Sequence, residues 1–390
     1  LSTGGMNGGY AEHLTHVFNH KSGYNYCTHP EDAPCTYREY LTDFVENKLG
    51  LSLKTTAGMA TIVSMQNVCI ETRSFRDITV TAIATASLEV NGGRVCDPAE
   101  YYEEADPTKP GTINIMLHVN ANMSPGCMAR TVLTLTEAKT AAIQELMGSS
   151  LYSSGIATGS GSDSVIVLSN AESDFHLTYA GKHSKLGELI GITVKTAVTK
   201  ALAKHMDLTP RTQHSMEKRT FRYGLTPEHY WETYLHSGGQ EREKQAFLAA
   251  LASLDKQDEM VAWTSLYVHL MDQVSWGLLT IQEAKEPADG ILDCLARIAG
   301  VDGKEETDGE SKFDLSQSGL PREAEGNRIR EEPEKEQPEH PEQPERPGGT
   351  AGSGESGVQP LKEAFTGLVV AIGSHGSHGS HTGKSVGKTQ

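Results

Sequence analysis

The residues best suited to chemistry form a loop from Gly155 to Asp163 that reads Gly-Ile-Ala-Thr-Gly-Ser-Gly-Ser-Asp. Small residues let backbone amides approach a ligand closely, and oriented amides bind anions or stabilise an oxyanion. The apolar run 165–168 follows, so the order is loop and then strand. A nucleotide phosphate loop lies between a strand and a helix and has a different glycine spacing. The pattern therefore predicts either a small-molecule site or a tight turn into a buried strand.

A second candidate segment, from Gly181 to Glu188, reads Gly-Lys-His-Ser-Lys-Leu-Gly-Glu. Ser184 is a suitable N-cap, so we expect a helix to start here with its positive dipole end beside His183 and Lys185. His183 has the chemistry of a general acid, a general base or a metal ligand. Glu188 can orient His183 or share a metal with it, although Ser184 and Glu188 can equally serve only to stabilise the helix start.

Other polar residues carry weaker signals. Asn7 lies in the glycine-rich opening 1–9, which is either a flexible terminus or a loop that contributes an amide. Glu137 is the third helical residue of an expected capping box, Thr134–Glu137, where a structural role is more common than a catalytic one. No Gly-x-Ser-x-Gly elbow precedes a helix and no cysteine lies in a nucleophile signature, so the residues do not predict a triad. Three histidines would share one face and could bind a metal if their segment were helical: His13, His16 and His20. A solvated surface that carries histidines is the favoured interpretation.

Strand and helix signals alternate over the first 208 residues. Strands are expected at 78–88, 112–119 and 164–169, which are rich in Thr, Val and Ile. Helices are expected after the capping boxes at 36–39 and 134–137 and over 186–204, where apolar residues recur on one stripe. The fold class is therefore α+β or α/β, with one mixed sheet-and-helix domain over 1–208.

A small helical module is expected over 209–301 and a disordered tail over 302–390. Thr226-Pro227 starts one helix of the module, the segment 255–258 opens a second, and Pro287 starts a last helix that Gly300 ends. The tail is crowded with Glu, Lys, Arg and Pro, and only the apolar stretch 361–372 interrupts it. Its end repeats histidine every third residue, which indicates either a site for a divalent metal such as cobalt or nickel or an incidental low-complexity end: His375, His378 and His381.

Composition limits the function classes. The 390 residues carry a net charge of −17, which argues against a nucleic-acid footprint. The six cysteines are irregularly spaced without a Cys-x-x-Cys pair, as in reduced intracellular proteins, and no apolar run approaches the roughly 20 residues that span a bilayer. We therefore expect a cytoplasmic protein without nucleic-acid or membrane partners, and a homo-oligomer is compatible with the sequence.

An ordered set of segments resembles the adenosylcobinamide amidohydrolase family. Their order along the chain, which makes the set specific, covers roughly residues 1–205. The segments lie at 1–9, 55–59, 80–82, 110–115, 134–142, 155–163 and 181–191. Two departures stand out: the family loop usually reads Gly-Thr-Gly-Thr-Asp where this chain has 159–163, and the stretch 89–106 is less family-like.

The resemblance implies hydrolysis of the amide that joins aminopropanol to the corrin ring of adenosylcobinamide, which gives adenosylcobyric acid for cobalamin synthesis. Physically, this reaction needs a nucleophile or activated water, an oxyanion donor and an acid for the leaving amine. His183 and Asp163 are the acid–base candidates, supported by Lys185 and Glu188. The candidate substrate-binding residues are Asn7, Asn114, Glu137, Thr158, Gly159, Ser160, Gly161 and Ser162.

Two alternative schemes stay open: a hydroxyl nucleophile at Thr158 or Ser160, and a water activated by a divalent metal on His183 and Glu188. No cofactor is required by the pattern. A corrinoid-binding or trafficking protein without hydrolase activity is the alternative function.

Overall fold

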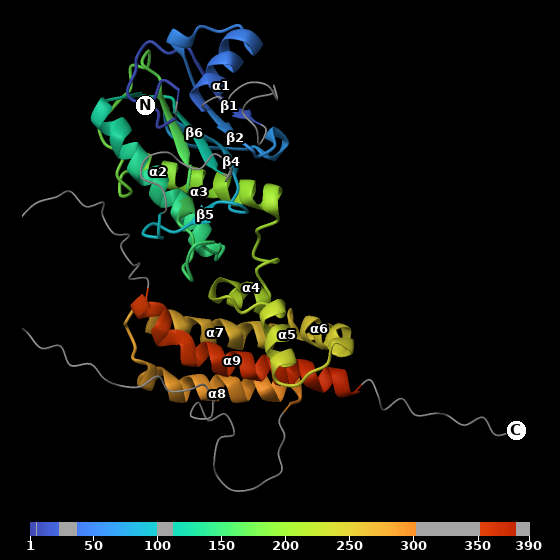
Figure 1. Cartoon of the computed structure of the whole chain (residues 1–390). Coiled ribbons are helices and arrows are strands. Elements are labelled where there is room, and N and C mark those ends of the chain that lie inside the picture. The colour runs from blue at the N-terminus through green and yellow to red at the C-terminus, as the bar shows by residue number, and fades with distance from the viewer. Residues whose placement is uncertain (5, 23–36, 100–111, 302–351, 380–390) are drawn as a thin grey trace, which may run out of the picture. The chain divides into compact units, whose positions relative to one another are not determined.

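The chain forms two compact units, residues 1–224 and residues 225–390. The computed structural model describes residues 1–4, 6–22, 37–99, 112–301 and 352–379 (Figure 1). The expected boundary at 208 falls inside the first unit, because the chain after the last long helix of that unit continues to pack against it. Gln213, for example, donates its side-chain amide to the carbonyl of Leu146 at 2.7 Å.

A four-stranded sheet with the order β3-β4-β6-β9 forms the centre of the first unit. Strands β3 and β4 and strands β4 and β6 pair antiparallel, whereas β6 and β9 pair parallel. The fold is thus a mixed α and β structure, as expected from the sequence. The strands are β3 (Cys69–Phe75), β4 (Ile78–Ala86), β6 (Ile113–Val119) and β9 (Ser164–Ser169).

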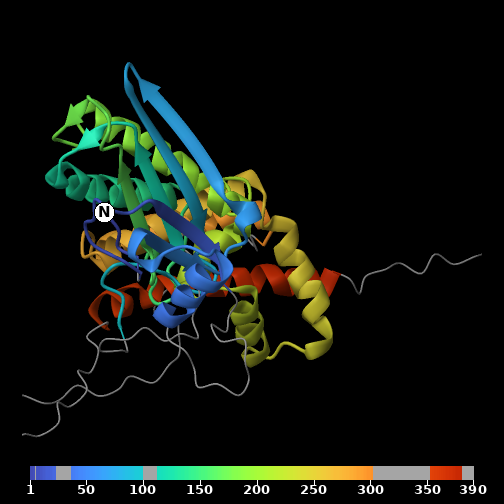
Figure 2. The ribbon, with the colours of Figure 1, turned by 90° about the horizontal axis from the view of Figure 1, so that it is seen from above.

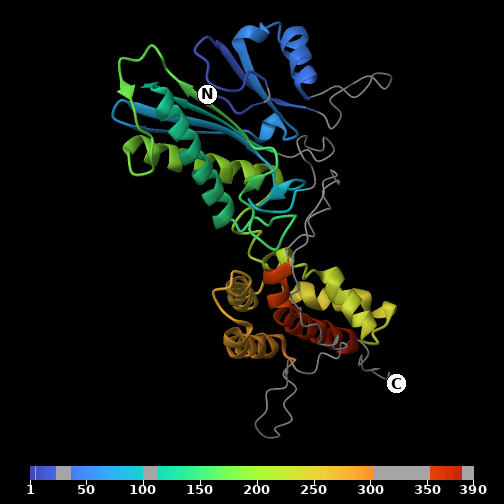
Figure 3. The ribbon, with the colours of Figure 1, turned by 60° about the vertical axis from the view of Figure 1, so that its left-hand side comes forward.

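Two long helices, α2 (Pro125–Glu145) and α3 (Lys185–Met206), cover one face of this sheet (Figure 3). The core between them is apolar because alternate strand residues point toward the helices, such as Val80, Ala82 and Ala84 of β4. The alanines of β4 leave room for α3, which meets β4 through Val194, Ala197 and further apolar residues on one stripe.

Shorter elements complete the first unit. Strand β1 (His16–Lys21) pairs parallel with β2 (Thr56–Thr61), next to α1 (Tyr37–Asp43). The chain start lies along β9, where the Leu1 ammonium donates to the Val167 carbonyl at 2.9 Å. The remaining elements are α4 (Met216–Thr220) and the two-residue strands β5 (Gly92–Gly93), β7 (Asn122–Met123), β8 (Gly159–Ser160) and β10 (His176–Leu177), which pair as β5–β8 and β7–β10.

One expectation for the first unit is wrong. Thr134–Glu137 is no helix start but lies inside α2, which begins after Ser124, an N-cap whose hydroxyl accepts from the Cys127 amide. The Thr134 hydroxyl instead donates to the Ala180 carbonyl. His16 and His20 lie in β1 and not on a helix. Thr36 of the other expected capping box lies outside the described residues.

The second unit is helical. Helix α5 begins after Thr226 as expected, and α8 ends at the left-handed residue Gly300. However, α8 begins after Thr280, because Thr280 and Glu283 form a capping box, and Pro287 lies inside it. The helices are α5 (Pro227–His236), α6 (Lys244–Leu254), α7 (Asp258–Ser275), α8 (Ile281–Ala299) and α9 (Gly352–Gly379).

Helix α9 corrects the expectation for the tail. The apolar stretch 361–372 lies in a 28-residue helix that packs against α5, α6, α7 and α8. Leu361 and Phe365 are fully buried, and the Leu361 carbonyl accepts from the Tyr267 hydroxyl at 2.8 Å. The sequence did not predict this helix, because polar residues flank the apolar stretch and the helices that it packs against are distant in the sequence. Residues 302–351 and 380–390 lie outside the described residues, so the disorder expected there stays a prediction.

Among the described residues, no helix has the length and apolar character that a membrane crossing needs.

Replacing Phe365 with Ala tests whether α9 stabilises the second unit. Its ring is fully buried and lies 5.2 Å from the Tyr267 ring, centroid to centroid. The cavity should lower the free energy of unfolding by about 3–5 kcal/mol. Chemical denaturation of the full chain, followed by helical circular dichroism, measures this loss. Gln359→Ala, on an exposed position of the same helix, should change the value by less than about 0.5 kcal/mol.

Candidate active site

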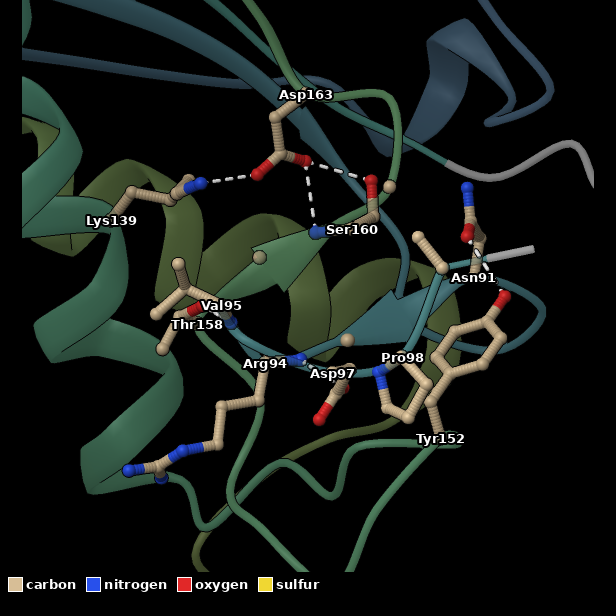
Figure 4. A pocket seen from close by; sticks show the side chains of 14 residues that line it. Asn91, Arg94, Val95, Asp97, Pro98, Lys139, Tyr152, Thr158, Ser160 and Asp163 are labelled. Atoms are coloured by element: carbon tan, nitrogen blue, oxygen red, sulfur yellow. Dashed lines mark hydrogen bonds and ion pairs between the residues drawn. The ribbon is translucent and has the colours of Figure 1, made fainter. Parts of the chain in front are cut away.

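A cavity of about 470 Å³ lies in the first unit at one end of the sheet (Figure 4). Its walls come from three segments: residues 91–99 after β4, residues 152–163 before β9, and one turn of α2. These segments meet because β4 ends where β6 begins, and β9 begins beside the start of β6, so that Ala86 pairs with Ile113 and Asn114 with Ser164. The volume is within the range typical of small-molecule sites.

An ion pair between Lys139 of α2 and Asp163 forms one wall of this cavity. The two side chains are only 10% and 17% exposed, so the pair is largely removed from water. The Lys139 ammonium binds Asp163 Oδ2, while Oδ1 accepts the Ser160 hydroxyl at 2.7 Å, the Ser160 amide at 3.1 Å and the Ile113 amide at 3.1 Å. Four donors therefore orient one carboxylate beside a serine hydroxyl.

The glycines of the predicted loop make room for this arrangement. A Cβ on Gly159 would lie 2.2 Å from Asp163 Oδ2 and 2.6 Å from Lys139 Nζ. A Cβ on Gly161 would lie 2.7 Å from the Asn91 amide oxygen. Glycine is needed at both positions because side chains of the site approach the backbone this closely.

The loop amides are already bound within the protein, which changes the role expected for them. The amides of Thr158 and Gly161 donate to the carbonyls of Gly93 and Asn91, and the Ser160 amide donates to Asp163. These bonds tie the loop to the segment after β4 through the β5–β8 pair. Of these three amides, none is left to stabilise an oxyanion.

The opposite wall carries Arg94, whose guanidinium has no ion pair or hydrogen bond with any residue that the structure describes. Its backbone amide donates to Asp97 Oδ2 at 2.6 Å, and the hydroxyls of Ser150 and Ser153 also donate to Asp97. Asp97 therefore fixes the turn at Arg94. In Figure 4 the Arg94 side chain runs away from Ser160 and Asp163, and it lies over Gly155, where a Cβ would be 2.5 Å from Arg94 Cδ.

Two further side chains complete this wall, Tyr152 and Asn91, joined by a 3.1 Å hydrogen bond from the tyrosine hydroxyl to Asn91 Oδ1. Thr158 also lines the cavity, and its Oγ1 accepts the Val95 amide at 2.9 Å. Thr158, Gly159, Ser160, Gly161 and Asp163 are thus the predicted site residues that the structure brings together. Ser162 is exposed and does not line the cavity, although its carbonyl accepts the Thr112 hydroxyl.

His183 lies at the other end of the sheet. It is exposed, and its neighbour Lys185 lies with Nζ 4.7 Å from the centroid of the Phe75 ring, where β3 turns into β4. The length of β4, roughly 25 Å at the usual rise per residue, separates this end from the cavity. The structure therefore does not bring His183 together with Asp163, because the chain crosses the sheet between them.

Glu188 and Glu137 are engaged in ion pairs outside the cavity. Glu188 pairs with Lys185 at 2.6 Å, and Glu137 pairs with Lys182 at 2.7 Å, both exposed. Glu137 thus lies on the outer side of α2, whereas Lys139, two residues later, points inward to Asp163. Neither glutamate lines the cavity.

The two predicted asparagines are structural in this fold. The side-chain amide of Asn7 donates to the carbonyls of Leu53 and Thr56, at 2.5 and 2.8 Å, which uses both of its hydrogens. The Asn114 amide is buried and donates to Asn19 Oδ1 and to the Ala60 carbonyl. Both side chains therefore join β1 and β2 to their neighbours and leave no donor for an oxyanion.

A divalent metal has no evident residue set in the described part of the chain, where no three His, Cys, Asp or Glu side chains gather. His375 is exposed near the end of α9, with Nδ1 3.1 Å from the Ala371 carbonyl oxygen. His378 lies in the same helix, and His381 lies outside the described residues. The expected histidine site in the tail stays a prediction.

Comparison with known proteins assigns the first unit. A model of the adenosylcobinamide amidohydrolase family matches residues 1–210, which is more than half of the chain. The chain belongs to the adenosylcobinamide amidohydrolase family. An uncharacterized protein of Methanocaldococcus jannaschii is 35% identical over 187 residues, covering 44% of this chain and 72% of that protein. No solved structure matches the chain.

The family match covers the whole cavity of this adenosylcobinamide amidohydrolase family member. Sequence reasoning missed Lys139 and Arg94. Lys139 lies in the family-like segment 134–142, but the supposed capping box drew attention to Glu137 two residues earlier. Arg94 lies in the stretch 89–106, where the resemblance is loose. The only sequence feature that points to Arg94 is the turn-forming segment Val90-Asn91-Gly92-Gly93 directly before it.

Gly159→Ala tests whether the close approach at the loop organises the site. The added methyl group should separate Lys139 from Asp163, because both lie within 2.6 Å of its position. We expect turnover of adenosylcobinamide to fall at least about tenfold and stability to fall by about 1–3 kcal/mol. Enzyme assay and thermal denaturation measure the two effects. Gly126→Ala, in the first turn of α2 with open space around the new Cβ, should leave both unchanged.

Proposed function

We propose that this protein hydrolyses the amide that joins aminopropanol to the corrin ring of adenosylcobinamide. The products are adenosylcobyric acid and free aminopropanol. The observation that carries the proposal is the Lys139–Asp163–Ser160 cluster inside a cavity of the family-matched unit. A role in corrinoid salvage and a cytoplasmic location belong to the same proposal.

The cavity size supports binding of the substrate's side chain and not of its whole body. About 470 Å³ accommodates a drug-sized group, whereas an adenosylated corrinoid combines a macrocycle and a nucleoside. We therefore place the aminopropanol amide inside the cavity and the corrin ring at its mouth. Val95, Pro98 and Ala99 are exposed at the rim and provide an apolar edge for the ring.

Ser160 is the nucleophile in this proposal. Its Oγ attacks the amide carbon while its proton passes along the existing 2.7 Å hydrogen bond to Asp163 Oδ1. Arg94 also lines the cavity, and we assign the oxyanion on the carbonyl oxygen to its guanidinium, which must turn toward Ser160 to reach it. The carbon–nitrogen bond then breaks, and Asp163 returns the proton to the leaving amine.

Water completes the reaction. It attacks the resulting ester carbon and gives one proton to Asp163. As the carbon–oxygen bond to Ser160 breaks, Asp163 passes that proton to the serine oxygen, which restores the Ser160 hydroxyl and releases the carboxylic acid. Lys139 holds Asp163 in place throughout, because its ammonium binds Oδ2 in a region that excludes most solvent. One water is consumed in total, and no oxidant or second substrate is needed.

The first experiment incubates the purified chain with adenosylcobinamide and separates the corrinoids by liquid chromatography with mass detection. Adenosylcobyric acid and an equal amount of aminopropanol are expected. Arg94→Ala should lower kcat/KM by about a hundredfold or more, since it removes the oxyanion donor. Tight corrinoid binding without product would instead support the alternative, a corrinoid-binding or trafficking protein.

A second experiment separates the candidate catalytic groups. Ser160→Ala should lower kcat by about a thousandfold or more, and rapid quenching of the unaltered chain should reveal a corrinoid ester on Ser160. Ser162→Ala is the matched control, because this exposed serine of the same loop does not line the cavity. Turnover by Ser160→Ala within tenfold of the unaltered chain would refute the nucleophile and favour direct attack by water.

His183→Ala should keep activity within about twofold, because His183 lies near the opposite end of the sheet. The same assay decides this prediction. A loss above a hundredfold, with the fold intact by circular dichroism, would return His183 to the mechanism.

A further inference from the structure

Strand β3 is an edge of the central sheet. The other edge, β9, is covered by the start of the chain through the Leu1–Val167 and Ser2–Ile166 contacts. Among the described residues, no strand lies along the outer side of β3. Figure 2 shows the long blue β3–β4 hairpin extending away from the other strands of its unit. An uncovered edge of this length is a ready template for another strand.

The backbone groups available on this edge can be assigned. Thr79 of β4 exchanges hydrogen bonds with Asn120 on its β6 side, through its own amide and carbonyl. Thr79 pairs with Ser74, so this pair does not exchange backbone hydrogen bonds within the hairpin. Hydrogen-bonded and non-hydrogen-bonded residue pairs alternate along an antiparallel ladder, so every second residue of β3 has its amide and carbonyl directed away from β4. The amides and carbonyls of Ile70, Thr72 and Ser74 therefore point outward, away from β4.

The charges on β3 favour one register with an identical strand. Three two-fold antiparallel registers bring these outward groups together, with centres at Glu71, Thr72 or Arg73. A centre at Glu71 places two glutamates opposite each other, and a centre at Arg73 places two arginines opposite each other. Only the centre at Thr72 places Glu71 opposite the partner's Arg73, twice by symmetry, and opposite charges across strands are favourable.

Apolar exposure on the same strand supports such a contact. Ile70 is 60% exposed and Phe75 is 40% exposed, at opposite ends of β3. In the register centred on Thr72, Phe75 lies opposite the partner's Cys69 and Ile70 lies opposite the partner's Ser74. Both apolar side chains would lose contact with water, which adds to the backbone hydrogen bonds.

We propose that two copies of this chain form a dimer by antiparallel pairing of β3 with the partner's β3 about Thr72, which joins two four-stranded sheets into one. The occupant of this edge is a second copy because the strand is self-complementary in charge. The rival interpretation is that Glu71 and Arg73 protect the edge. Within one chain, Arg73 Nη1 donates to the Thr72 carbonyl at 2.8 Å and lies 3.4 Å from Glu71 Oε2. Glu71 Oε1 accepts Lys200 Nζ at 2.5 Å. In the dimer, that arginine turns to the partner's Glu71. The proposal does not depend on the catalytic function.

Charge reversal tests the register. Sedimentation of the full chain up to about 100 μM should show a dimer. Arg73→Glu and Glu71→Arg should each weaken the dimer about tenfold or more, because each places like charges opposite one another. The double variant E71R/R73E restores opposite pairs and should recover most of that loss. Thermal denaturation checks that each variant is folded. A monomer in the unaltered chain, or singles as dimeric as the parent, would overturn the proposal.

Cysteine cross-linking gives a second, independent test. In the proposed register, Thr72 lies opposite the partner's Thr72 with Cα atoms about 5.5 Å apart, within disulfide reach. Thr72→Cys should therefore form a covalent dimer under mild oxidation. Ser74→Cys, two residues further along the same face, is the matched control, because its partner copy lies roughly 13 Å away. Equal cross-linking of both variants, or none by Thr72→Cys, would refute this pairing.

Discussion

The ion pair between Lys139 and Asp163 is the contact on which the candidate active-site cavity depends. It joins α2 to the loop before β9, and the same carboxylate accepts the amide of Ile113 at the start of β6. Removing one partner of so enclosed a pair leaves an uncompensated charge, which typically costs several kcal/mol. The neighbouring glycine at 159 and the Ser160 hydroxyl are both arranged around this pair. Site geometry and local stability are therefore coupled here.

Sheet topology decides which side chains can act together. Strand β4 runs antiparallel to β6, and β6 runs parallel to β9. The last residues of β4 and the first residues of β6 and β9 therefore lie at the same end of the sheet. The loops that carry Arg94 and Ser160 extend from that end of the sheet and pair with each other through β5 and β8. The segment around His183 lies toward the opposite end. The family-like segments at 155–163 and 181–191 thus have separate places in the fold.

The helical unit shows a different constraint. Helix α9 returns after a long interval of sequence and buries Phe365 and Leu361 among α5 to α8. Tyr267 is fully buried and donates its hydroxyl to the Leu361 carbonyl of α9, and this burial raises the pKa of the phenol far above its ordinary value. A neutral, donating tyrosine fits this place, since a buried phenolate would cost much more. The last helix is therefore part of the core of its unit.

Local signals in the sequence determined the mixed fold class, the strands β4, β6 and β9, and the helix α3, because periodicity and caps act over a few residues. They also marked the loop 155–163 and the family. Only the tertiary structure decided that Lys139 binds Asp163 and that Arg94 lines the same cavity. It also decided that the side-chain amides of Asn7 and Asn114 donate to acceptors within the protein. Those outcomes depend on residues 24 to 95 positions apart, whose meeting is set by strand order and helix packing and not by any local pattern.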